Sequence, residues 1–405
     1  MQILRPLAAL LALLACLAAP LAAQSKDVRK NDPSLCPWCK GDKALMEKAG
    51  IASHGEFAFG KEESTRKVDG VLPTCEIKWI ETAHFEIGIA LAPHKVKQEE
   101  KEKIRTELAR LQQVLPDVDP KSKILDPWLR AHLYAQRCEE IYARMVEILG
   151  AKDLKFPPKG TLYDGTGMYL GCGPHLGQGG KYEVLIVPAE ANLTGYLQSQ
   201  FGLLTKKTQR WNLNAADTLS VTIHCAEEGL REDEGLHGHL GFNLAINLFD
   251  GFKHYSYDTP IWLREGLAHM VEREIGPRFN SFDSAEGGIA QTTRKEKWEP
   301  EVRKLVAGGK APRMAELMSM KEYSDLTLDR HYATWSMVQY LAQQKPAEFA
   351  KFCGALKGRL NAQRIPDGSN MPEAHREFFK EHLGLSYADF DKAWSEWVLA
   401  TYGAQ

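Results

Sequence analysis

The chain has 405 residues, and its 51 Lys and Arg residues nearly balance its 53 Asp and Glu residues, which leaves a net charge of −2. Its basic runs are short and have acidic neighbours, which excludes the electropositive surface of a nucleic-acid-binding protein. No repeat with a period of about 20 to 50 residues is present, which excludes solenoids and propellers. A chain of this length is expected to form about two or three domains.

The N-terminus has the pattern of a secretory signal peptide over residues 1–23. A basic start precedes an apolar run from Leu7 to Leu21, and Ala22 and Ala23 form a small-residue cleavage site. We therefore expect export to the periplasm, the cell surface or the medium. Leu13-Leu-Ala-Cys16 also resembles a lipoprotein cleavage site, which would make Cys16 a lipidated first residue. No later apolar stretch reaches the roughly 20 residues of a spanning helix, so no transmembrane segment is expected after signal removal.

Seven cysteines follow this segment, and two of them form the motif Cys36-Pro-Trp-Cys39. The spacing suits a redox dithiol, whose first thiol has a lowered pKa at a helix N-terminus. It also suits a zinc knuckle, which needs two further ligands. Redox motifs follow a strand, whereas a polar leader precedes this one, and only Cys75 lies nearby as a further ligand. We therefore expect a structural disulfide, either local or of the Cys39–Cys75 type.

The predicted elements are mixed at first and entirely helical later, which indicates an α+β fold. Residues 76–89 read as a strand, 95–115 and 128–149 as helices, 156–180 as a glycine-rich loop, and 182–188 and 218–224 as buried strands. Helices follow at 233–249, at 260–274 and repeatedly between 332 and 402. The predicted divisions are a cysteine-containing segment 24–75, an α/β segment 76–155, a central core 156–278 and a helical C-terminal domain 279–405.

Two successive predicted helices carry polar residues at helical spacing. In the helix at 233–249, leucines recur at every fourth position and form an apolar stripe. His239 and Asn243 lie one turn apart on a neighbouring face. Glu265 and His269 have the same spacing in the helix at 260–274.

The string Pro260-Ile-Trp-Leu-Arg-Glu-Gly-Leu-Ala-His269 resembles the second-helix signature of gluzincin metallopeptidases. These are the thermolysin-like and aminopeptidase-N-like enzymes and their bacterial peptidase MA-like relatives. The resemblance implies a metallopeptidase-like core in which Glu265 is the third zinc ligand. It also places His239 at the first ligand of an H-E-x-x-H motif. Leu240 then replaces the general-base glutamate, and Asn243 replaces the second histidine. Tyr332 matches the tyrosine that stabilises the transition state in aminopeptidase-N-type enzymes.

The two replacements remove parts that peptide hydrolysis at zinc requires. The reaction needs three protein ligands, an open position for water and a base. Leu240 cannot accept a proton, and the amide oxygen of Asn243 is a poor zinc ligand beside imidazole. His269 is the one residue that could complete a site with His239 and Glu265. No cofactor is therefore expected, and zinc is the metal that the remaining residues could hold.

The sequence thus favours an exported pseudo-peptidase that binds an extended peptide or a protein without cleaving it. In active relatives an edge strand pairs with the substrate backbone. Residues 218–224 form the last strand before the motif helix and are the predicted edge. Two alternatives remain: an active zinc metallopeptidase with a variant metal site, and a thiol redox protein that uses Cys36 and Cys39.

Overall fold

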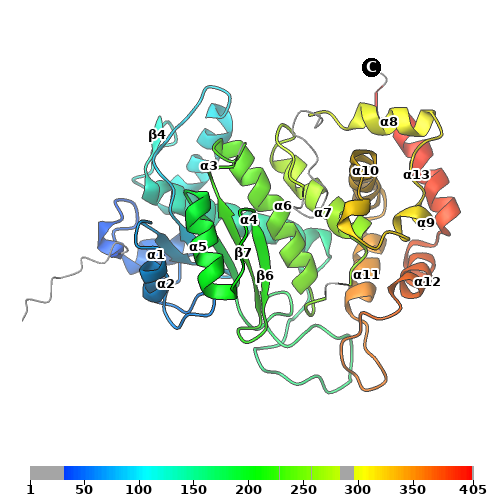
Figure 1. The fold of residues 1–405 in the computed structure, drawn as a ribbon, viewed down its shortest axis with the longest axis horizontal. Coiled ribbons are helices and arrows are strands. Elements are labelled where there is room, and N and C mark those ends of the chain that lie inside the picture. The colour runs from blue at the N-terminus through cyan, green and yellow to red at the C-terminus, as the bar shows by residue number, and fades with distance from the viewer. Residues whose placement is uncertain (1–31, 228, 257, 283–295, 404–405) are drawn as a thin grey trace, which may run out of the picture.

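A computed structural model describes residues 32–227, 229–256, 258–282 and 296–403 (Figure 1). The predicted signal peptide and the lipoprotein site at Cys16 lie outside these residues. In the described residues, strands mix with helices up to His224 and every later element is a helix. The predicted α+β class and the C-terminal helical region are therefore confirmed. Among the residues described, no helix is both long and apolar enough to span a membrane.

A five-stranded mixed sheet forms the centre of the N-terminal part. Its strands are β1 (Lys78–Glu81), β2 (Phe85–Ile89), β5 (Tyr182–Val187), β6 (Gln209–Leu213) and β7 (Thr218–His224). They lie in the order β1-β2-β5-β7-β6, with the three inner strands parallel and the two outer strands antiparallel to their neighbours. Strands from the predicted segments 76–155 and 156–278 thus share one sheet.

Two strand predictions need correction. The strand expected over 76–89 is the hairpin of β1 and β2, in which Lys78 pairs with Ile89 and Glu81 with Glu86. The strand at 218–224 is internal, so its prediction as the edge is wrong. The edge is β6, which pairs with β7 from Gln209 to Leu213. Its sequence Gln-Arg-Trp-Asn-Leu is mostly polar and carries little of the apolar signal that marks a buried strand.

Helices cover both faces of this sheet because side chains alternate along each strand. In β5, Val184 and Ile186 belong to one core cluster, whereas Leu185 and Val187 belong to another. The first cluster also contains residues of α4 (Pro127–Ile148) and α6 (Asp233–Gly251). The second cluster also contains residues of α2 (Thr65–Val71) and α5 (Glu190–Phe201). The motif helix α6 therefore packs directly on the sheet.

The other N-terminal elements are η1 (Pro33–Leu35), α1 (Lys43–Lys48), the paired strands β3 (His94–Lys95) and β4 (Ile124–Leu125), and α3 (Lys101–Val114). The helix expected from residue 95 begins at Lys101, and Lys95 itself belongs to β3. The predicted start of α4 is confirmed. The Asp126 carboxylate accepts hydrogen bonds from the first free backbone N–H groups of the helix, and Pro127 takes its first position.

The C-terminal part begins with α7 (Ile261–Ile275), which packs between α6 and α10. The helices that follow are α8 (Glu299–Ala307), α9 (Met314–Leu317), η3 (Tyr323–Asp325), α10 (Leu328–Gln344), α11 (Pro346–Lys357), α12 (Met371–Leu383) and α13 (Tyr387–Thr401). Pro346 takes the first position of α11, and Ser386 with Asp389 forms a capping box at the start of α13.

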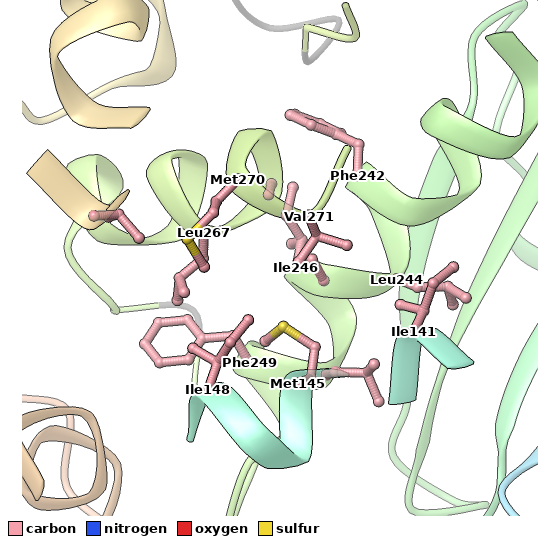
Figure 2. Packing of buried hydrophobic residues seen from close by; sticks show 14 of the residues in the cluster. Ile141, Met145, Ile148, Phe242, Leu244, Ile246, Phe249, Leu267, Met270 and Val271 are labelled. Atoms are coloured by element: carbon pink, nitrogen blue, oxygen red, sulfur yellow. The ribbon is translucent and has the colours of Figure 1, made fainter. Parts of the chain in front are cut away.

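One hydrophobic core joins α4, α6 and α7 (Figure 2). Its members include Ile141, Met145 and Ile148 of α4, Phe242, Ile246 and Phe249 of α6, and Leu267, Met270 and Val271 of α7. A glycine is required where α7 meets α10. A Cβ at Gly266 would lie 2.6 Å from the carbonyl oxygen of Thr334 and 2.6 Å from Val338. The glycine of the Glu-Gly-Leu-Ala string therefore has a packing role.

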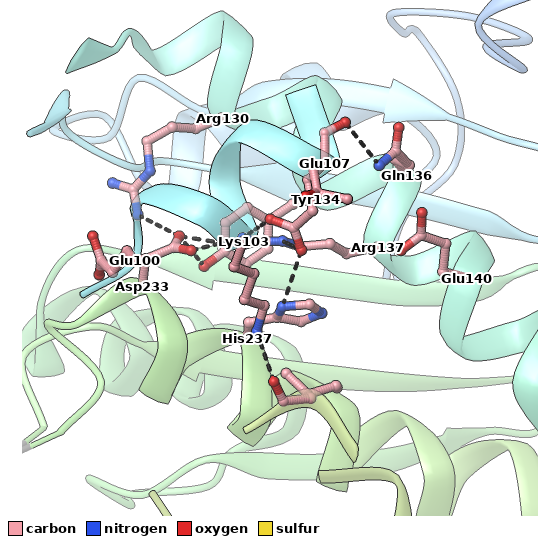
Figure 3. A network of polar contacts seen from close by, with 12 residues as sticks. Glu100, Lys103, Glu107, Arg130, Tyr134, Gln136, Arg137, Glu140, Asp233 and His237 are labelled. Carbon is pink, nitrogen blue, oxygen red and sulfur yellow. Dashed lines mark hydrogen bonds and ion pairs between the residues drawn. The ribbon is translucent and has the colours of Figure 1, made fainter. Parts of the chain in front are cut away.

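A buried ionic network holds the start of α6 on α3 and α4 (Figure 3). The guanidinium of Arg137 donates to carboxylate oxygens of Glu107 and Asp233, each at 2.7 Å. The hydroxyl of Tyr134 donates to Asp233 over 3.0 Å. Burial alone would raise the pKa of Asp233, but the charge and hydrogen bonds of Arg137 hold this pKa well below its usual range. The orientation of the motif helix is thus fixed by a charged anchor.

Candidate functional site

His239 lies on α6, is half-buried, and contacts a hydroxyl group at each ring nitrogen. Its Nδ1 lies 2.8 Å from Ser281 Oγ, and its Nε2 lies 2.9 Å from Thr208 Oγ1. Thr208 immediately precedes the edge strand β6, and Ser281 follows α7. The imidazole therefore bridges the start of the edge strand and the chain after α7. Both atoms through which it would bind a metal are engaged by hydroxyls.

Asn243 lies one turn further along α6 and is buried. Its amide nitrogen donates to the backbone carbonyl of His239 over 2.8 Å. Its amide oxygen accepts a hydrogen bond of 2.7 Å from the guanidinium of Arg210, which projects from β6. The only atom through which Asn243 could bind a metal is thus in contact with a cation. Arg210 carries no signal in the sequence, because a single arginine in a polar strand has no pattern that links it to a helix further along the chain.

Leu240 stands at the position of the general base and has no exposed surface, within the main core cluster. Its hydrocarbon side chain offers no atom that could take a proton from water. The structure thus places a core residue where the resemblance would require a catalytic carboxylate.

A buried group of potential metal ligands lies between α7 and α10. Ligand atoms of Glu265, His269 and His331 all lie within 4.8 Å of one another, and all three residues have no exposed surface. His269 Nε2 lies 3.0 Å from His331 Nδ1. The set expected from the sequence was His239, Glu265 and His269. In the structure, His331 of α10 lies with Glu265 and His269, and His239 is outside this group. The only sequence signal for His331 is its position directly before Tyr332.

Polar contacts connect this buried group to His239. His269 Nδ1 lies 3.3 Å from one carboxylate oxygen of Glu272, and the other accepts a 2.7 Å hydrogen bond from the backbone N–H of Ser281. Ser281 in turn contacts His239 through its hydroxyl. A continuous polar chain therefore runs from half-buried His239 to fully buried His331. Glu272 lies two turns after Glu265 on the same helix, and this spacing was its only signal in the sequence.

Tyr332, the residue matched to a transition-state-stabilising tyrosine, is 2% exposed. Its ring packs edge-on against Trp298, with 4.8 Å between ring centroids. It therefore lies beside His331 on α10 as part of the main core cluster.

The cysteine motif differs from its prediction. Cys36, Cys39 and Cys75 are free thiols in this structure, which forms neither the local pairing nor the Cys39–Cys75 pairing. Cys36 Sγ lies 3.1 Å from His132 Nε2, and Cys39 Sγ lies 3.2 Å from His54 Nε2. Cys75 is buried in the separate cluster between α2 and α5. The sequence missed both histidines because they lie in other segments of the chain.

The pKa values of the two thiols are shifted in opposite directions. The hydrogen bond with Cys39, followed by burial, raises the pKa of Cys36 to about 12, whereas the hydrogen bond from Cys36 lowers the pKa of Cys39 to about 7. In redox dithiols the first, more exposed cysteine carries the lowered pKa. Both thiols here have no exposed surface, and the first has the raised pKa. The geometry therefore disfavours thiol exchange with another protein.

Comparison of the chain with protein-family models, curated proteins and solved structures finds no match.

Proposed function

We propose that this protein is a non-catalytic, peptidase-like binding protein that takes up an extended peptide along the edge strand β6. The proposal starts from the gluzincin-like string around Glu265. The observation that carries it is the contact between Arg210 and Asn243. A cation provided by the protein occupies the neighbourhood of the expected second zinc ligand, and Leu240 supplies no base.

A zinc ion at this position would be repelled by the positive charge of Arg210. It would have to share the Asn243 oxygen with a guanidinium, and like charges about 4 Å apart repel by several kcal/mol even at an effective dielectric constant near 20. It would also displace the hydroxyls that contact His239. Loss of the base alone typically costs about 10²- to 10⁴-fold in rate. Each of these changes disfavours hydrolysis, and together they favour a retained fold without hydrolytic activity.

The edge strand is suited to binding by strand addition. Among the described residues, β6 pairs only with β7 and so forms an edge of the sheet, which is the place where an extended peptide can add as a further strand. Trp211 in the middle of β6 is 36% exposed and stacks on Phe201 at 4.5 Å between ring centroids. An exposed aromatic side chain on an edge strand gives an added peptide an apolar contact beside its backbone hydrogen bonds.

A second candidate function, a metallopeptidase with a variant site, rests on Glu265, His269 and His331. These three residues provide a carboxylate and two imidazoles within bonding reach of one metal ion. Complete burial of all three argues against a substrate-facing site, because hydrolysis needs an open coordination position for water.

The test combines a cleavage assay and a binding assay on the purified protein. A library of unstructured peptides is incubated with and without added zinc, and bound peptides are then identified. Hydrogen exchange of the complex is expected to show new protection at residues 209–213 and none at the opposite edge, β1. Trp211→Ala should weaken peptide binding, whereas Leu162→Ala, at an exposed apolar residue in the glycine-rich loop, should leave it unchanged.

Two results would overturn the proposal. Zinc-dependent cleavage that is lost in Glu265→Gln would establish the second candidate instead. Absence of any peptide-dependent protection in β6 would remove the binding role.

A further inference from the structure

We propose that Cys36, Cys39, His54 and His132 bind one zinc ion in a closed, four-coordinate structural site that clamps the N-terminal segment onto α4. This site is separate from the peptidase-like residues and does not depend on the proposed function. Two cysteines two residues apart with two histidines form a ligand set typical of structural zinc.

Three of the four proposed ligands lie close to one another, and the fourth, His54, contacts one of them, Cys39. The two sulfur–nitrogen pairs are separated by 3.1 Å, between Cys36 and His132, and by 3.2 Å, between Cys39 and His54. Ligand atoms of Cys36, Cys39 and His132 all lie within 4.8 Å of one another. Bond lengths of about 2.3 Å to sulfur and 2.05 Å to nitrogen place tetrahedral sulfur and nitrogen ligands about 3.6 Å apart. To accommodate the ion, the two sulfur–nitrogen pairs would shift outward, and His54, whose ring centroid lies 5.8 Å from that of His132, would turn toward the other three ligands.

Contacts around the ligands fix the tautomer of His54 and stabilise the sulfur of Cys36. His54 Nδ1 lies 3.0 Å from the backbone carbonyl of Trp79, so this nitrogen carries the proton and Nε2 keeps its lone pair for a metal. The backbone N–H of Cys39 donates to Cys36 Sγ over 3.5 Å, an interaction that stabilises a thiolate. The ring of Trp128 packs edge-on against His54 at 5.3 Å between ring centroids.

The backbone of the motif forms a tight turn that brings the two sulfurs together. The N–H of Lys40 donates to the carbonyl of Cys36 over 3.0 Å. Lys40 and Gly41 have φ values of 55° and 66°. A Cβ at Gly41 would lie 3.2 Å from the side chain of Pro33, so glycine fits this position. Trp38, between the cysteines, donates to the Asp126 carboxylate over 3.0 Å, and Asp126 also caps α4, the helix that carries His132.

Burial identifies the site as structural rather than catalytic. The exposed fractions are 0% for Cys36 and Cys39, 3% for His54 and 2% for His132. Four protein ligands in such surroundings leave no coordination position for water or substrate. Their neighbours in the hydrophobic cluster include Leu108, Leu129 and Leu133.

The clamp joins parts of the chain that are far apart in sequence. Cys36 and His132 are separated by 96 positions, and their contact ties the motif to α4. The elements preceding β1 are short, with α1 spanning six residues, so a metal would supply order that their own packing provides only weakly. On binding, two thiols become thiolates and release two protons to solvent, while both imidazoles bind as neutral ligands.

The first experiment measures the metal content of the purified protein, prepared without chelator, by elemental analysis. We expect about one zinc per chain. After removal of zinc, addition of cobalt(II) should produce a thiolate-to-cobalt charge-transfer band, which a site of nitrogen and oxygen ligands cannot produce. Chelator should lower the melting temperature, and re-addition of zinc should restore it.

Matched variants locate the ion. Cys39→Ser and His54→Gln should lose the zinc and the cobalt charge-transfer band, whereas Cys138→Ala, a buried cysteine on α4, and His382→Gln should keep both. Glu265→Gln should also keep both, which separates this site from the buried group on α7. If a ligand variant fails to fold, cobalt titration of the wild-type protein after chelation still decides the outcome. A Cys36–Cys39 disulfide in the native protein, a cobalt spectrum without the thiolate band, or zinc that is lost in Glu265→Gln but kept in Cys39→Ser would overturn the proposal.

Discussion

The guanidinium of Arg210 donates to the amide oxygen of Asn243 over 2.7 Å and so joins the edge strand to the motif helix. One turn away, Thr208 makes a parallel link to His239 over 2.9 Å. The two residues that would be histidine ligands in the resembled family therefore hold β6 on α6. These contacts give both residues a structural role, and this role would be lost if a metal displaced them.

The first prediction concerns the restoration of a zinc site. Asn243→His alone should not add zinc, because the cation of Arg210 remains at the same position. Asn243→His combined with Arg210→Ala should add about one equivalent of zinc to that of the wild-type protein, since His239, the new histidine and Glu265 would form three ligands. The bound zinc is counted by elemental analysis after dialysis. Adding His239→Gln should abolish the extra equivalent, and an unchanged zinc content in the double variant would contradict the alignment with the gluzincin motif.

Much of the fold could be predicted because its long elements carry their own periodicity. The helices α4, α6 and α7 and the strands β5 and β7 were predicted within a few residues, since their apolar positions and caps lie within the elements themselves. The short polar strand β6 was missed, and with it the position of the sheet edge. It is a strand because it pairs with β7 in a hairpin, and such pairing cannot be predicted from the hydropathy of the segment.

The sites were less predictable because they depend on contacts between distant segments. The pairing of Cys36 with His132 and of Arg210 with Asn243 requires the tertiary fold, and neither pair has a local spacing that reveals it. By contrast, Glu265 and His269 lie one turn apart on one helix, and this spacing correctly predicted that their ligand atoms lie together.

The second prediction tests the packing role of the glycine in the Glu-Gly-Leu-Ala string. Gly266→Ala should destabilise the protein by about 1 to 3 kcal/mol, because the added methyl group would overlap the backbone of Thr334 on α10. Gly195→Ala is the matched control: it lies within α5, and nothing is within 4 Å of its new Cβ. This control should stabilise the helix by up to about 1 kcal/mol. Urea denaturation of both variants gives the two changes, and equal changes would contradict the packing role.

The third prediction concerns the buried ionic anchor of α6. Arg137→Met should destabilise the protein by about 3 to 5 kcal/mol, because it leaves the carboxylates of Glu107 and Asp233 buried without their main partner. Arg144→Met removes an ion pair with Glu274 at the half-exposed surface and should cost less than about 1 kcal/mol.

The pH dependence of this anchor follows from the lowered pKa of Asp233. Because the folded-state pKa is below the unfolded-state value, the contribution of Asp233 is complete above the unfolded-state value of about 4 and is lost as the pH falls below it. Urea denaturation at pH 7 and at about pH 3 should show that the difference between wild type and Arg137→Met shrinks on acidification. A difference that grows toward acid would contradict this account.

The fourth prediction concerns His375, which is buried and neutral. Trp262 Nε1–H donates to its Nε2 over 3.2 Å, so its Nδ1 carries the proton and donates to the Tyr387 hydroxyl over 2.6 Å. Burial lowers the pKa of His375 to about 3. Protonation of its Nε2 would place the new N–H group opposite the N–H group of Trp262, and the hydrogen bond between them would be lost. The unfolded chain takes up this proton near pH 6.5, so the folded state loses relative stability as the pH falls below that value, by about 2 kcal/mol at pH 5.

His375→Gln isolates this effect, because an amide can accept from Trp262 and donate to Tyr387 without titrating. The variant should be less stable than wild type at pH 7, since its side chain fills the site less completely. Between pH 7 and pH 5, however, it should lose about 2 kcal/mol less unfolding free energy than wild type does. His237 and His254, whose pKa values burial also lowers, titrate alike in both proteins and cancel in the comparison. Identical pH dependence in the two proteins, measured by urea denaturation, would show that His375 is protonated in the folded state as readily as in the unfolded chain.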